Sequence, residues 1–389
     1  MESETLTKYK AAGDIVHKVI QKLVPLCVEG ANALELCLEG DKAIEEGLGA
    51  VYSKAVKGVK VTKGVAFPTC ISVNNCVAHF SPLASDPVGS AAKLSEGDVV
   101  KIHLGAHIDG YASISAETLI VGATAESPAT GKKADVVKAA WTAAEAAMRL
   151  IKVGDKNYAV TDAIAKVVSE FDTTAVEGML SCQQVQGAIE GKKKIILNPT
   201  PEQRRSTEVS IFAEGEVYGM DILVSSGEGK TRTEDAKVTI YLPQPEVTYQ
   251  LKMKSSRAVF SEIKRKAGSF PFNLRILDDE KRAPLGIGEA VQHGLLRPLE
   301  VVYTPSETYV AAFHFTIALL AGGPALLTHP PVWYSADKLK TEKELKDETL
   351  KELLTKKLRD GKKKKSKKAA AAEGEEKEEK AEEVEEEKE

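Results

Sequence analysis

Apolar side chains recur every three or four residues at the start of the chain, which is the spacing of one buried helix face. In the first helix that this pattern predicts, the apolar face holds Ala12, Val16, Val19, Ile20 and Leu23. Pro25 ends the pattern, because proline lacks the backbone N–H that a helix interior needs. The same periodicity predicts helices over about residues 31–52, 135–151 and 161–171.

Segments rich in β-branched residues alternate with these helices. Asp109-Gly110 separates VVKIHLGAHI from YASISAETLIV, which predicts a hairpin with a two-residue turn. Strands are also expected over about 209–224 and 309–320, and a further helix over about 256–266. The mixture predicts an α+β fold.

The predicted hairpin has a definite register. A turn at Asp109-Gly110 places His103 opposite Ala116, so that His103 and Ile114 are diagonal neighbours on one face. Their Cα atoms are then ~7–8 Å apart. Two carboxylates at these positions could hold metal ions, but this chain has an imidazole and an aliphatic side chain that cannot be a ligand.

His103 and His107 have the spacing of an HxxxH metal motif. On a helix both imidazoles would reach one ion, whereas on a strand four residues span ~13 Å. Because the hairpin makes this segment a strand, we interpret His107 as a hydrogen-bonded strand histidine.

Charge is concentrated at the end of the 389-residue chain, which has 43% hydrophobic residues and a net charge of −4. Residues 356–368 hold nine Lys or Arg against one Asp, a net +8, and residues 373–389 hold eleven Glu against three Lys, a net −8. Such blocks without aromatic residues predict disorder over 361–389. Five scattered cysteines, a polar N-terminus and the lack of a long apolar run favour an intracellular protein without a membrane partner.

Several motifs together carry a family resemblance. They are FPTCISVNNCVAHFSP (67–82), KIHLGAHIDGY (101–111), VEGMLSCQ (176–183), GEVYGMD (215–221), YQLKMKSSRAVFSEIKRK (249–266) and HGLLRP (293–298). The chain resembles the methionine aminopeptidase and creatinase superfamily, and within it the ErbB-receptor-binding, proliferation-associated family. This resemblance implies a pita-bread body over 1–240 and 300–340, an inserted helical subdomain over 241–299, a terminal helix over 341–360 and the charged tail.

Active enzymes of that superfamily bind two divalent ions through two Asp, one His and two Glu. By the resemblance, these positions are occupied here by His103, Ile114, Cys182, Asp221 and His314. Only Asp221 keeps an anionic oxygen, and His79 keeps the substrate-side imidazole. We therefore expect a vestigial pocket without catalytic residues, metal or cofactor. Two alternatives are a single zinc on Cys182, His103 and His314, and a metal-free reaction with His79 as general base.

Basic segments are the candidates for another function. Around the predicted helix 256–266 the cations are Lys252, Lys254, Arg257, Lys264, Arg265 and Lys266, and the tail adds Lys362, Lys363, Lys364 and Lys365. Such clusters are typical either of a solvated surface or of a site for nucleic-acid phosphates. The resemblance implies binding to the large ribosomal subunit and rRNA near the nascent-chain exit, in the cytoplasm, nucleus and nucleolus. Structured mRNA and transcriptional regulators are further partners that it implies.

A polar helix is expected to begin at Thr341, with Glu344 completing a capping box. It carries an LxxLL motif in Leu350, Leu353 and Leu354. This motif is either a site for transcriptional corepressors or the apolar stripe that docks the helix. The first hypothesis is a non-catalytic, ribosome- and RNA-binding protein with roles in ribosome biogenesis, translation and growth regulation. Its alternatives are a residual metal-dependent methionine aminopeptidase and a corepressor adaptor.

Overall fold

The computed structural model describes residues 1–54, 60–280 and 283–359. Its main feature is a nine-stranded sheet, in which seven strands follow one another in the order β1-β3-β4-β15-β9-β7-β8. Two short strands extend it, since β16 pairs with β15 and β6 with β9. The strands are β1 (Lys63–Val73), β3 (Val99–Ile108), β4 (Tyr111–Ile120), β6 (Thr174–Ala175), β7 (Leu180–Gln184), β8 (Lys194–Ile196), β9 (Val217–Ser225), β15 (Val310–Leu320) and β16 (Gly323–Leu326).

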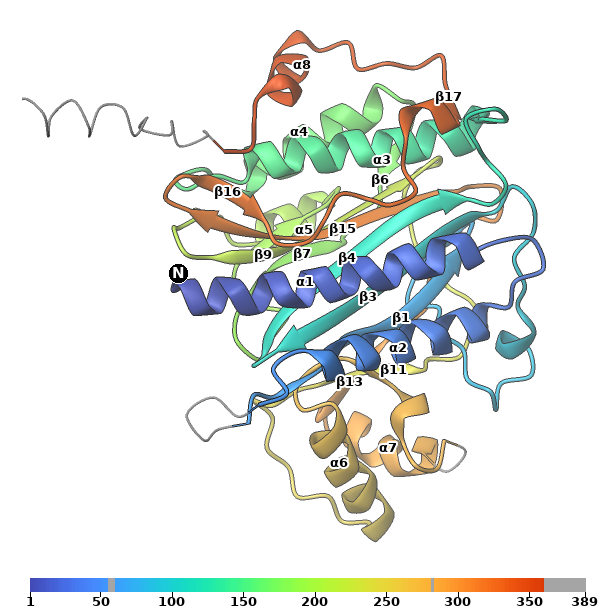
Figure 1. Ribbon diagram of the computed structural model, residues 1–389, viewed down its shortest axis with the longest axis vertical. Helices are drawn as coiled ribbons and strands as arrows, with labels where there is room; N and C mark the ends of the chain where they lie inside the picture. Colours follow the sequence, from blue (N-terminus) through green and yellow to red (C-terminus); the bar gives the residue numbers. More distant parts are fainter. Residues whose placement is uncertain (55–59, 281–282, 360–389) are drawn as a thin grey trace, which may run out of the picture. The chain divides into compact units, whose positions relative to one another are not determined.

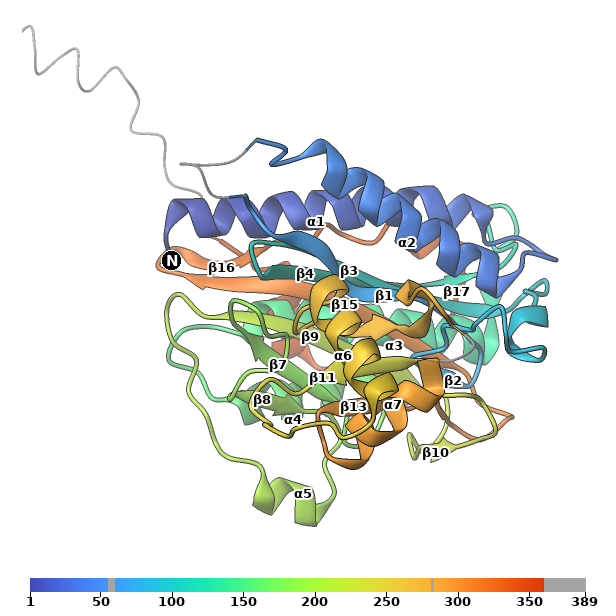
Figure 2. The same ribbon diagram turned by 90° about the horizontal axis from the view of Figure 1, so that it is seen from below.

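Four long helices pack on this sheet. They are α1 (Ser3–Leu23), α2 (Ala33–Ala50), α3 (Gly131–Leu150) and α4 (Asn157–Ser169). The first two lie along β1, β3 and β4, and α3 packs on β15 and β9 (Figures 1 and 2). The expected helices over 31–52, 135–151 and 161–171 are confirmed, with ends shifted by a few residues.

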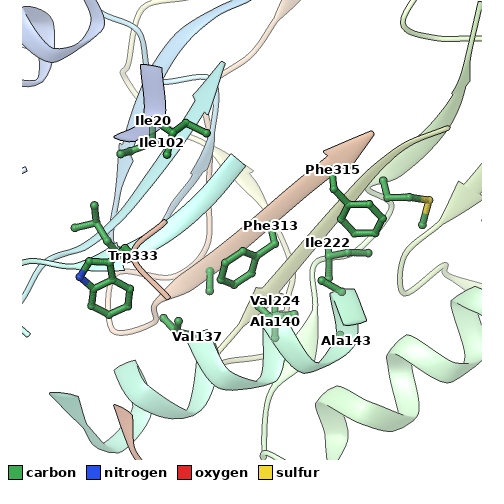
Figure 3. Packing of buried hydrophobic residues seen from close by; sticks show 14 of the residues in the cluster. Ile20, Ile102, Val137, Ala140, Ala143, Ile222, Val224, Phe313, Phe315 and Trp333 are labelled. Atoms are coloured by element: carbon green, nitrogen blue, oxygen red, sulfur yellow. The ribbon is translucent and has the colours of Figure 1, made fainter. Parts of the chain in front are cut away.

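Alternation along the strands decides which side chains face these helices. Ile102, Ile222 and Phe313 belong to one apolar cluster with the four helices, and the residue next to each of them along its strand points to the opposite face. Figure 3 shows Phe313 between the strands and α3, where Ala140 and Ala143 let the helix approach closely. The opposite face of the sheet is therefore left to carry His103, Asp221 and His314.

Residues 240–299, together with Leu83, form a separate apolar cluster. It joins α6 (Lys254–Lys266) and α7 (Ala283–Gln292) to a small sheet of β11 (Ile240–Pro243), β12 (Phe272–Asn273) and β13 (Leu296–Leu299). Both helices lie beyond the β1 edge of the large sheet (Figure 1). Residues 1–358 nevertheless form one compact unit, so the proposed subdomain boundaries at 240 and 300 stay a prediction.

Arg275 anchors this segment to the rest of the unit. Its guanidinium Nη2 lies 2.6 Å from Asp41 Oδ2, and Nη1 donates to Ser81 Oγ at 2.9 Å and to the Pro82 carbonyl at 2.8 Å. The Arg275 side chain is 6% exposed. A fork of buried donors thus fixes the inserted segment against α2 and the loop after β2 (Cys76–Ala78).

The remaining elements are short. They are α5 (Pro201–Ser206), β5 (Ala129–Thr130), β10 (Arg232–Thr233), β14 (Val302–Tyr303) and β17 (Leu339–Lys340), with 3-10 turns at Val24–Leu26, Gly89–Ala91, Leu274–Ile276 and Ala336–Lys338. Strand β14 pairs with β10 and β2, and β17 pairs with β5. Within the described ranges no helix is long and apolar enough to span a bilayer.

The predicted hairpin is confirmed. Strands β3 and β4 pair with His103 opposite Ala116 and Ile108 opposite Tyr111. Asp109 and Gly110 have φ of 56° and 78°, the two left-handed residues that a type I′ turn requires. The predicted strand over 209–224 is wrong in its first half, because β9 begins only at Val217. The Glu216 carboxylate there accepts from the Ala213 N–H at 2.8 Å and holds a turn.

The predicted terminal helix over 341–360 is also too long. Helix α8 spans only Glu348–Thr355 and is capped by Asp347, whose side chain accepts from the Leu350 N–H at 2.8 Å. The expected capping box at Thr341 and Glu344 is therefore wrong. Thr341 instead donates its hydroxyl to Asp135 at the start of α3.

Candidate functional site

The sheet register brings the expected pocket residues to one face. His314 on β15 lies opposite Asp221 on β9 and opposite Ala116 on β4, and Ala116 in turn lies opposite His103 on β3. Directly opposed residues in antiparallel strands share a face. His103, Ala116, His314 and Asp221 thus form one row across four strands.

Aromatic rings fill this row. The imidazoles of His103 and His314 stack with their centroids 5.2 Å apart, and Phe67 of β1 stacks on the other side of His103 at 4.3 Å. His103 Nε2 and both nitrogens of His314 are buried and have no hydrogen-bond partner in the protein. The arrangement is a packed stack of rings beside one carboxylate.

Burial sets the charges of this stack. It lowers the pKa of His103 to about 3, and the neighbouring His314 acts in the same direction, so that His103 is neutral at pH 7. For Asp221 burial acts to raise the pKa, but His314 and His103 beside it bring the pKa below its ordinary value. Asp221 Oδ1 lies 3.6 Å from His314 Nδ1. The row therefore places the Asp221 carboxylate close to a His103 ring that is neutral at pH 7.

Ile114 and Cys182 complete the set of positions that the family resemblance assigns to metal ligands. Ile114 is 2% exposed and packs with Phe67 and Cys70, and its side chain fills the space above Gly105. Burial raises the pKa of the Cys182 thiol to about 12, so the sulfur is protonated at neutral pH. Neither side chain supplies an anionic ligand.

His79 is held in a single orientation. Its backbone has φ of 68°, a left-handed conformation that is uncommon for residues other than glycine. Its Nδ1–H donates to the Glu300 carbonyl at 2.8 Å, which leaves Nε2 as the acceptor of the ring. Burial lowers the pKa of this imidazole as well.

These residues do not fit the paired divalent ions of active family enzymes. Two ions a few ångströms apart need several anionic oxygens, and the row His103, Ala116, His314 and Asp221 supplies one carboxylate. Among the described residues, no three His, Cys, Asp or Glu side chains are grouped so that they could share one ion. The structure thus does not assemble the alternative zinc site on Cys182, His103 and His314.

His107 lies apart from His103. Its ring stacks on Phe270 with centroids 4.2 Å apart, and its Nδ1 is buried without a hydrogen-bond partner. The expectation of a hydrogen-bonded histidine is wrong for this nitrogen, because ring packing rather than a polar contact holds the imidazole. A shared HxxxH ion is excluded by the separate surroundings of the two rings.

Two contributors to the pocket were not singled out from the sequence. Phe67 provides the ring under His103, and Gln184 lies two residues from Cys182 on the same face of β7. The Gln184 amide reaches Gly219, where a β-carbon would come within 2.5 Å of its nitrogen. Because alternate residues of a strand share a face, the sequence of residues 180–184 could have placed Gln184 beside Cys182. No local sequence feature predicts the contact between Phe67 and His103.

The predicted cations of the inserted segment are all exposed. This set comprises Lys252, Lys254, Arg257, Lys264, Arg265 and Lys266. Lys266 pairs with Glu262 and Asp278, and Arg257 donates to the Leu251 and Lys252 carbonyls. The other predicted cluster, Lys362 to Lys365, and the tail over 361–389 lie outside the described residues.

The leucine motif packs against the body. Leu350 is 7% exposed within the main apolar cluster, and Leu353 and Leu354 pack against the same cluster. Lys166 pairs with Asp347, and Glu170 accepts from the Lys346 N–H, so polar contacts also tie the segment before α8 to α4. This placement is that of a docking stripe.

Comparison with known proteins gives a consistent picture. Residues 7–194 match Metallopeptidase family M24. The chain is 44% identical over 352 residues to the Curved DNA-binding protein of Schizosaccharomyces pombe, with 90% of each protein covered. It is 44% identical over 326 residues to ERBB-3 BINDING PROTEIN 1 of Arabidopsis thaliana, covering 84% of this chain and 80% of that one. The solved structure of a thermophilic Arx1 matches with a TM-score of 0.86 at 32% identity, over 92% of this chain and 100% of that chain.

Proposed function

The chain belongs to the ErbB-3-binding, proliferation-associated branch of metallopeptidase family M24 and has its pita-bread fold, and we propose that it is a non-catalytic member that binds the large ribosomal subunit and structured RNA. The single observation that carries this proposal is the chemistry of the row His103, Ala116, His314 and Asp221. A surface that has lost its metal ligands and kept its shape is suited to binding rather than hydrolysis.

The absence of catalysis follows from charge. One carboxylate cannot offset two divalent cations, and without them no bound water becomes a nucleophile at neutral pH. His79 retains an acceptor nitrogen, but its Nδ1 proton is donated to a backbone carbonyl, and among the described residues no second acid or base is hydrogen-bonded to the ring. We therefore assign His79 a structural role.

RNA binding is supported by the exposed cations of α6. Lysine and arginine side chains that contact phosphates release condensed counterions, which supplies much of the affinity for nucleic acids. Within the described part of the chain, Lys252, Lys254 and Lys264 have no carboxylate within ion-pair distance. A relative that is 44% identical bears the name Curved DNA-binding protein, which favours a nucleic-acid ligand here too.

The biological setting is carried over from the family resemblance. We place the docking site on the large subunit near the nascent-chain exit, with roles in ribosome biogenesis, translation and growth regulation. Cytoplasm, nucleus and nucleolus are the compartments in which these roles would be carried out. The docked α8 argues against the corepressor alternative, because the three leucines are used inside the protein.

Sedimentation with purified ribosomes at several salt concentrations tests the binding. About six phosphate contacts give a slope of log affinity against log salt near −4 to −5. Charge reversal at Lys252, Lys254, Lys264 and Arg265 should weaken the association strongly, whereas His79→Ala should leave it unchanged. Association that does not respond to salt would refute the electrostatic part of the proposal.

Metal analysis and a methionine-release assay with added Co²⁺, Mn²⁺ or Zn²⁺ test the non-catalytic part. We expect neither stoichiometric metal nor turnover. Both together would establish the residual aminopeptidase instead.

A further inference from the structure

A cavity of about 670 Å³ lies where the inserted segment meets the hairpin turn of the large sheet. Its cations come from two distant parts of the sequence. Lys60 and Lys63 precede and begin β1, and Lys264, Arg265 and Lys266 form the last turn of α6. None of the described residues that line it is an aspartate or glutamate.

The floor of this cavity is built from three turns that hydrogen-bond to one another. The Gly187 N–H donates to the Gly110 carbonyl at 2.8 Å, and the Ser269 hydroxyl donates to the Gly187 carbonyl. Gly110 and Gly187 have φ of 78° and 77°, and a β-carbon on Gly110 would come within 2.9 Å of the Gly187 nitrogen. The close approach therefore requires glycine at position 110, and the positive φ favours glycine at position 187. The end of α6 is fixed in place over this floor.

The cations differ in how far they are already neutralised. Lys266 is paired with Glu262 at 2.8 Å and Asp278 at 2.6 Å, whereas Arg265 is 4.0 Å from Asp278. Lys264 has its ammonium 4.7 Å from the ring centroid of Phe260, which positions the charge without cancelling it. Lys60 is exposed and has no carboxylate partner in the described ranges. Lys60, Lys264 and Arg265 thus leave their positive charge largely uncompensated around one hollow.

We propose that this cleft binds the phosphodiester backbone of RNA, with Lys60 from the body and Lys264 and Arg265 from the inserted segment on the same stretch of strand. This rests on the proposed function and adds to it a definite site. Cations from two separate segments that line one cavity suit a chain that carries one charge per nucleotide. Among the described residues that line the cavity, the aromatic rings of His107 and Phe270 stack on each other, and the cations around them favour an anionic chain over a neutral peptide.

The test is direct binding of a fluorescent ten-nucleotide oligouridine to the full-length chain, measured by anisotropy across a salt series. Lys60 is the informative residue, because it lies outside the exposed α6 surface already assigned to RNA. We expect Lys60→Glu to weaken binding at least tenfold at 100 mM salt. The triple change Lys60→Ala, Lys264→Ala and Arg265→Ala should lower the slope against log salt by about 2, since single-stranded contacts contribute about 0.7 each. Lys132→Glu, an exposed lysine at the start of α3, is the matched control.

The outcomes separate the cleft from the wider proposal. If Lys60→Glu behaves like Lys132→Glu while the pair Lys252→Glu and Lys254→Glu abolishes binding, the cleft is refuted and RNA binding stands. If the unaltered chain binds neither oligouridine nor ribosomes, the proposed function fails as well. A ten-residue oligoglutamate that binds where oligouridine does not would assign the cleft to an acidic peptide and overturn the inference. Equal thermal unfolding of all variants establishes that the differences arise from the surface.

Discussion

Ile114→Asp places a carboxylate at a position that the family resemblance assigns to a metal ligand, and we expect it to destabilise this protein severely. Ile114 is 2% exposed and packs with Phe67 and Cys70 on the inner face of the sheet. Loss of its burial costs about 2 to 3 kcal/mol. To avoid a buried charge at pH 7, the new carboxyl group must stay protonated about 3 pH units above its ordinary pKa. This lowers the free energy of unfolding by about a further 4 kcal/mol.

The total, about 6 kcal/mol, is comparable to the whole stability of a typical domain. It should depend on pH in a definite direction. The new carboxyl binds its proton in the folded state and releases it in the unfolded state, so the folded state gains as the pH falls. Between pH 7 and pH 5 the deficit should shrink by about 3 kcal/mol.

Urea denaturation in the presence of EDTA measures both quantities, because chelation keeps trace ions from contributing. Ile114→Asn is the matched control, since it has the shape of aspartate without the charge, and its deficit should not change with pH. An Ile114→Asp protein within about 1 kcal/mol of the unaltered chain would show that the pocket still tolerates a charged ligand. The same deficit at pH 5 and pH 7 would refute the burial argument.

Three further predictions follow from other contacts. Arg275→Ala should cost about 3 kcal/mol in urea denaturation, since it leaves the Asp41 carboxylate without its buried partner; the double change Arg275→Met with Asp41→Asn should recover part of the loss, and no recovery would contradict the ion-pair account. The pKa of His103 is lowered to about 3, so stability present above the ordinary pKa of 6.5 is lost as pH falls toward 3. The free energy of unfolding should therefore fall between pH 6.5 and pH 4.5, and His103→Phe should remove about 2 to 3 kcal/mol of that fall. An unchanged pH profile would count against burial of a neutral ring. Leu350→Ala should cost about 2 to 3 kcal/mol and expose the terminal segment to limited proteolysis, whereas an unaffected protein would return the motif to the corepressor hypothesis.

The hairpin shows what local sequence determines. A two-residue turn at Asp109-Gly110 leaves only one register, so the placement of His103 opposite Ala116 follows from the order of the residues alone. Helix boundaries were predictable to a few residues for the same reason, because the apolar period is local. The terminal helix was overestimated because Thr341 and Glu344 imitate a cap, while the Thr341 hydroxyl is used by Asp135 far away in the chain.

The packing of the pocket could not be predicted in this way. Phe67, His103 and His314 come from three strands, and their stacking depends on how those strands lie side by side in the sheet. The cleft at the end of α6 depends similarly on contacts across long stretches of sequence, between Ser269, Gly187 and Gly110. A sequence pattern identifies charged residues but not the charges that share one cavity.

Rigidity of α6 connects the fold to the proposed function. Its 13 residues span ~20 Å, so Lys254 and Arg257 near one end and Lys264 and Arg265 near the other are held a fixed distance apart. Arg275 and Ser269 fasten the inserted segment at separate points, which prevents the helix from reorienting when RNA binds. A surface ordered in advance loses less conformational entropy on binding, so each phosphate contact contributes more of its gross energy to affinity. A loosened segment, as in Arg275→Ala, should therefore bind RNA more weakly with an unchanged salt slope, because the number of contacts stays the same while the cost of ordering them rises.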